Sequence, residues 1–171
     1  TQKCGDNFLY AKLICDDFSN GISDISKLPS GLEYIYQSYF QRAFSKFEFT
    51  NEYRKAFSVI IAAKENISLD LLSDILKWDR SIAYDFSKLI SDLINNNSFP
   101  QQIEFFHKSI DDWLKSDQVI TEFQIDEQQG LDLLFEYIVN TYKHNIALPY
   151  SIIKDWEYYG KRNSNRILFE Q

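Results

Sequence analysis

Residue types that commonly do chemistry are sparse in this chain and widely spaced. Its two histidines, His107 and His144, lie in different predicted helices, and neither belongs to an HxxxH or ExxH metal-binding pattern. The five glycines stand alone, whereas a phosphate-binding loop needs closely spaced glycines before a helix. No serine or cysteine has the neighbouring base or the sharp turn that a hydrolytic nucleophile requires. We therefore predict no catalytic residue, no metal site and no enzyme activity of this chain by itself.

Several aspartates between residues 70 and 92 could be mistaken for a metal-binding carboxylate cluster. They fall at predicted helix caps and on polar helix faces, where charged residues are usually solvated. We expect all of them to be exposed: Asp70, Asp74, Asp79, Asp85 and Asp92.

Composition indicates a folded, acidic protein. Hydrophobic residues make up 44% of the 171 residues and aromatic residues 16%, which predicts an aromatic-rich core and excludes a disordered chain. The net charge of −7 disfavours nucleic-acid binding. Cys4 and Cys15 are too few for a disulfide framework, and we find neither a membrane span nor a signal peptide. We expect a soluble cytoplasmic protein and, because methionine is absent even at position 1, part of a longer one.

Apolar spacing predicts a mainly helical fold that begins with a small helical subdomain over residues 1–49. One short helix is expected over residues 8–18, and a longer amphipathic helix follows Pro29 with the capping-box pair Ser30 and Glu33. The aromatic stripe from Tyr34 to Phe47 in the second helix could fill a partner's groove. At helical spacing, however, such a stripe more often packs in the core.

Residues 50–117 are predicted to form a winged helix. Three helices are expected from about residue 51 to Lys64, from the cap Ser68, and from the cap Asp79 through Leu93, and short turns link them. A polar turn over residues 95–100 and a β-prone run over residues 103–106 then indicate a small hairpin.

Residues 118–171 are predicted to be a helical linker. One helix starts near Asp126 and carries Leu131, Leu134, Phe135, Ile138 and Tyr142 inward. A last helix begins at Pro149 with Ile152, Ile153 and Trp156, and Gly160 separates it from a basic tail.

Three stretches, taken in order, resemble the region that follows the nucleotide-binding fold in NACHT-type STAND NTPases. They are GDNFLYAKLICDDF (Gly5 to Phe18), LPSGLEYIYQSYFQRAF (Leu28 to Phe44) and FFHKSIDDWL (Phe105 to Leu114). The sequence departs from this pattern where many relatives have Gly-His, because Gly130 is followed by Leu131. It also lacks the proline that related NTPases often place near the adenine, at the start of the first helix.

The resemblance implies a regulatory role in a signal-transduction NTPase whose C-terminal repeats are of the ankyrin, TPR or WD40 type. In such proteins a winged-helix histidine contacts the β-phosphate of bound ADP, and His107 matches that position. ADP or ATP, with Mg, would bind mainly to an N-terminal nucleotide-binding domain of the same chain. The region would hold the closed state, and its release would allow oligomers to form.

Two other functions stay open at the level of sequence. The chain could be a freestanding helical scaffold for protein interactions, in which His107 only caps or packs the junction after the hairpin. It could also bind DNA through the helix that starts after Asp79, but Arg80 and Lys88 are outnumbered there by acidic residues.

Overall fold

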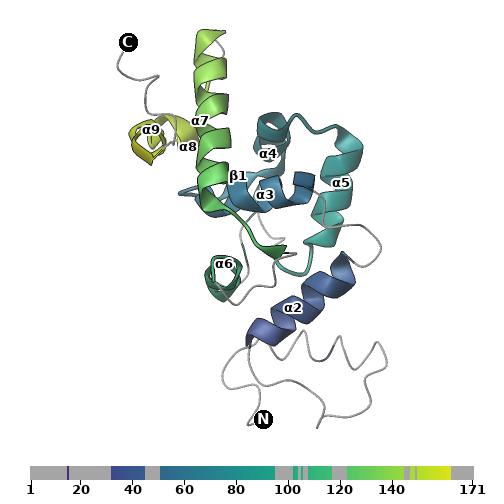
Figure 1. Ribbon diagram of the computed structural model, residues 1–171. Helices are drawn as coiled ribbons and strands as arrows, with labels where there is room; N and C mark the ends of the chain where they lie inside the picture. The colour runs from purple at the N-terminus through teal and green to yellow at the C-terminus, as the bar shows by residue number, and fades with distance from the viewer. Residues whose placement is uncertain are drawn as a thin grey trace.

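The computed structural model describes residue 15 and residues 32–44, 51–94, 102–103, 105, 108–116, 123–144, 147–148 and 150–162. This part of the chain is mainly helical, as predicted, and contains a small antiparallel sheet (Figure 1). Its helices are α2 (Leu32–Ala43), α3 (Asn51–Ala62), α4 (Leu69–Leu76), α5 (Arg80–Leu89), α6 (Lys108–Leu114), α7 (Glu127–Lys143), α8 (Tyr150–Ile153) and α9 (Trp156–Arg162). Its strands are β1 (Ile67–Ser68) and β2 (Gln102–Ile103). The helix predicted over residues 8–18 lies outside the described residues, except for Cys15, which is helical.

Three predicted helix starts are confirmed by hydrogen bonds from the capping side chains. The Ser68 hydroxyl accepts a bond of 3.1 Å from the Leu71 amide at the start of α4. Asp79 accepts bonds of 2.8 and 2.9 Å from the amides of Ser81 and Ile82 at the start of α5. Asp126 accepts a bond of 2.9 Å from the amide of Gln128 and starts α7. Each cap satisfies amides that have no partner within their helix.

The sheet joins two segments that are far apart in sequence. β1 lies between α3 and α4 and pairs antiparallel with β2, with Ile67 opposite Ile103. An isolated antiparallel bridge between Ile94 and Phe105 flanks the predicted polar turn. β1 was not predicted, since Ile67 stands in a short polar turn and no alternation of apolar residues marks a strand of two residues.

The aromatic stripe of α2 forms the centre of the core, as predicted. Phe40 is fully buried, and its ring centroid lies 5.1 to 5.6 Å from those of Phe44, Phe57, Trp113 and Phe123. These rings come from α2, α3, α6 and the residues before α7, so one aromatic cluster joins four parts of the chain. Among the described aromatic residues of the stripe, Tyr34 at its edge is the one that faces solvent.

α7 crosses α3 at very close range. An ideal Cβ on Gly130 would lie 1.9 Å from the Ser58 carbonyl oxygen and 2.8 Å from the Ala62 Cβ. Only glycine fits this crossing, because any side chain would push the two helices apart. Leu131 and Leu134 of α7 are also buried, and α7 packs along α3. The Gly130–Leu131 pair therefore has a packing role.

Two predictions about the last helices are wrong. Tyr142 is 76% exposed rather than inward-facing, because the end of α7 projects beyond the other helices (Figure 1). The single helix expected after Pro149 is instead two helices, α8 and α9, and α9 continues through Gly160 to Arg162. The chain turns at Asp155, whose backbone carbonyl accepts bonds from the amides of Tyr158 and Tyr159 and so starts a new helix.

The end of α5 also differs from prediction. The helix stops at Leu89, so Ile90 and Leu93 lie beyond it although both are buried. None of the described helices has the length and apolar character that a bilayer crossing requires.

Candidate functional site

The predicted phosphate contact, His107, lies outside the described residues, but the segments on both sides of it are described. Phe105 forms the bridge to Ile94, and α6 starts at Lys108, whose side chain is exposed. Ile110 and Trp113 of α6 are buried in the core and fix this helix. In sequence, residue 107 falls between the Ile94–Phe105 bridge and α6.

A partly buried hydrogen bond attaches α2 to the first turn of α6. The Tyr36 hydroxyl lies 2.5 Å from the Ser109 Oγ, and the Tyr36 ring packs 5.6 Å from that of Trp113. Burial raises the pKa of Tyr36, and the bond to Ser109 partly offsets this rise. A second α2 tyrosine, Tyr39, donates a bond of 2.8 Å to the carbonyl oxygen of Leu89. α2 thus holds the end of α5 and the start of α6 in a fixed relation.

The five aspartates are exposed, as the solvated-face interpretation predicts. Asp79 caps α5 with its carboxylate. Within the described ranges, no group of histidine, cysteine and acidic side chains is arranged to hold a metal ion.

His144 lies exposed at the end of α7, where sequence analysis gave it no role. Its amide bonds to the carbonyl of Asn140, and its Nδ1 lies 2.6 Å from the same oxygen. The ring therefore closes the helix end, which is an ordinary role for a residue at this position.

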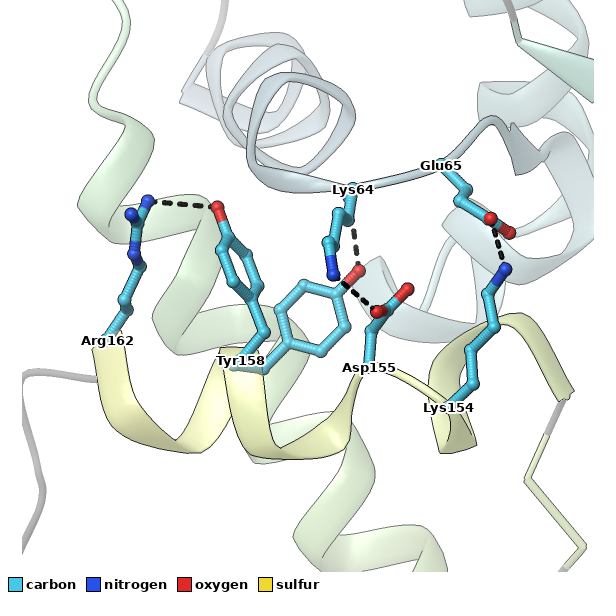
Figure 2. Close-up of polar contacts among 7 residues, drawn as sticks. Lys64, Glu65, Lys154, Asp155, Tyr158 and Arg162 are labelled. Atoms are coloured by element: carbon cyan, nitrogen blue, oxygen red, sulfur yellow. Dashed lines mark hydrogen bonds and ion pairs between the residues drawn. The ribbon is translucent and has the colours of Figure 1, made fainter.

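A polar junction between the end of α3 and helices α8 and α9 was missed by sequence analysis (Figure 2). The Lys64 ammonium forms an ion pair of 2.7 Å with Asp155, and the hydrogen bond to Asp155 is the main cause of a raised Lys64 pKa. The Lys64 amide donates a bond of 3.2 Å to the Tyr159 hydroxyl. These residues are about ninety positions apart, and nothing in their local sequence marks them as partners.

Large exposed hydrophobic side chains are scattered over the described surface. Tyr34, Tyr84, Tyr142 and Ile153 lie on four different helices, a distribution that is normal for a protein surface.

Comparison with known proteins provides no further guide to the function. No family model, no curated protein and no solved structure matches this chain.

Proposed function

We propose that this chain is the regulatory part of a cytoplasmic NACHT-type STAND NTPase and helps to hold its ADP-bound closed state. The observation that carries the proposal is the order and pairing of the elements that precede residue 107. A helix, a short strand and two further helices precede a second strand, which pairs antiparallel with the first. A winged helix would have this order of elements, which supports the resemblance carried by the three sequence motifs.

Further support comes from the bridge between Ile94 and Phe105. This bridge joins the chain just before residue 95 to the chain just after residue 104, as the pairing of the two strands of a wing would do. β1 and this paired region would then form the three-stranded edge of the winged helix.

The chemistry next to His107 suits a phosphate ligand. A histidine ring can donate hydrogen bonds to an anion, and the exposed Lys108 that follows adds a positive charge. Ser109 is already engaged with Tyr36, so we assign it no nucleotide contact. His107 is the phosphate-contacting residue of this proposal, and the rest of the nucleotide site belongs to an N-terminal nucleotide-binding domain of the same chain.

A phosphate contact made only in the closed state would act through differential affinity. A ligand shifts a conformational equilibrium only as far as it binds one state better than the other. ADP held by His107 would favour the closed state, whereas exchange for ATP with Mg would release the winged helix. Release would expose a surface for oligomerisation, and α7 to α9 would lead toward the C-terminal repeats.

The test is the oligomeric state of the full-length protein in the presence of ADP. His107→Ala should shift it from the closed monomer toward larger assemblies, as measured by light scattering on a sizing column. His144→Ala is the matched control, because it removes the other histidine from an exposed helix end and should leave the monomer unchanged. If His107→Ala stays monomeric with ADP and behaves like the control with ATP, His107 does not hold the closed state.

A further inference from the structure

Helices α8 and α9 form a short C-terminal arm (residues 150–162) that lies against the end of α3 and along α7. Figure 2 shows how polar side chains of the arm meet the segment that follows α3. The arm is held differently from α7, whose close crossing with α3 depends on apolar packing at Gly130.

Lys64 binds the arm through both its side chain and its backbone. Its ammonium pairs with Asp155, whose side chain is only 11% exposed, and its amide donates to the hydroxyl of Tyr159. Its Nζ also lies 5.2 Å from the centre of the Tyr158 ring. Lys64 alone therefore contacts three positions of the arm, and we call this set of contacts the latch.

Two further polar contacts hold the arm. Lys154, between α8 and α9, forms an ion pair with Glu65 next to the latch. At the end of α9, the side-chain amide of Gln128 in α7 donates a bond of 2.8 Å to the Arg162 carbonyl oxygen. These contacts lie at the surface, where water and salt compete with them.

Beneath the arm lies an apolar surface that is incompletely filled. Ile152 and Tyr159 are the buried hydrophobic residues among the described side chains of the arm. With Ile67, Leu71 and Leu134 they line a cavity of about 10 Å³, which holds at most one water molecule. The arm thus covers side chains from β1, α4 and α7 without close packing at every point.

We propose that the arm is a strap that docks reversibly on α3 and α7, and that the latch around Lys64 helps to hold it there. Segments held by exposed polar contacts and few buried side chains belong to the least stable parts of a fold and open separately from the core. Opening the strap would leave the α3–α7 crossing intact and would uncover the apolar surface around Ile67, Leu71 and Leu134. The strap needs no nucleotide, so its behaviour is independent of the proposed role of His107.

Hydrogen exchange on the whole chain tests this inference, with protection measured separately for the arm, α3 and α7. Lys64→Gln should speed exchange of the arm amides about twofold to fivefold, the range for one ion pair at the protein surface, and leave α7 unchanged. Salt at about 1 M should produce a similar change in the unmutated chain, since it screens surface charges over about 3 Å.

Lys55→Gln is the matched control, because it also removes one lysine charge but breaks a pair with Glu52 within α3. It should not affect the arm. Asp155→Asn combined with Lys64→Gln should speed exchange about as much as either single change does, since both remove the same ion pair. The inference is overturned if the arm exchanges as slowly as α7 in every variant, or if Lys64→Gln and Lys55→Gln act alike.

Discussion

Replacing Gly130 with alanine sets two known effects against each other at one position. In an open helix, Gly→Ala stabilises by about 1 kcal/mol because alanine has the better helix propensity. At the α3–α7 crossing, the new Cβ would lie 1.9 Å from the Ser58 carbonyl oxygen, far inside any real contact. α7 would have to move by about 1 Å, and a gap of that size forfeits a quarter to a half of each contact attraction along the interface. Overpacking should cost about 3 to 4 kcal/mol, so the net loss should be about 2 to 3 kcal/mol.

The measurement is urea unfolding of Gly130→Ala beside Glu136→Ala, a matched change on the exposed face of the same helix. Glu136→Ala should change the free energy of unfolding by about 0.5 kcal/mol or less. Gly130→Ala should also lower the melting temperature by about 5 to 10 °C. Equal or greater stability for Gly130→Ala would mean that α7 does not cross α3 at this distance, and it would refute the packing role of Gly130.

Three further outcomes follow from the core and its polar groups. Phe40→Ala should cost about 3 to 5 kcal/mol in urea unfolding, whereas Tyr34→Ala at the exposed edge of the same helix should be nearly neutral. Ser58→Ala should stabilise the protein by about 1 kcal/mol, because the buried Ser58 hydroxyl has no hydrogen-bond partner within the described part of the chain; a loss of stability would show that this hydroxyl has one. Burial raises the pKa of Tyr36 and of Tyr159 in the folded state, so their contribution is fully present below the unfolded pKa of about 10 and is lost as pH rises through the folded values. Urea midpoints should therefore fall more steeply above pH 10 in the unmutated chain than in Tyr36→Phe.

Much of the helical framework could be predicted because its signals are local. Ser68, Asp79 and Asp126 each indicate a helix start in the sequence, and the capping hydrogen bonds form as expected. The stripe from Ile35 to Phe44 repeats at helical spacing, so its burial also follows from the sequence alone.

Other features depend on partners that are distant in sequence. β1 is a two-residue strand whose only signal is its pairing with β2. Tyr142 has the right helical spacing, but α7 extends beyond the helices that could cover it. The Lys64–Asp155 ion pair joins residues 91 positions apart, and the sequence does not indicate which surface lysine will pair with which aspartate. His107 was singled out by resemblance to a family, since its own spacing marks no site.

The central claim is that His107 holds ADP in the closed state, and the most direct measurement is the rate at which ADP leaves the full-length protein. A hydrogen bond to a charged group contributes about 1.5 to 3 kcal/mol, and each 1.4 kcal/mol corresponds to a factor of ten. His107→Ala should therefore release a fluorescent ADP analogue about tenfold to a hundredfold faster than the unmutated protein, while His144→Ala should release it at the original rate. Equal release rates for all three proteins, or no ADP binding by any of them, would contradict the account.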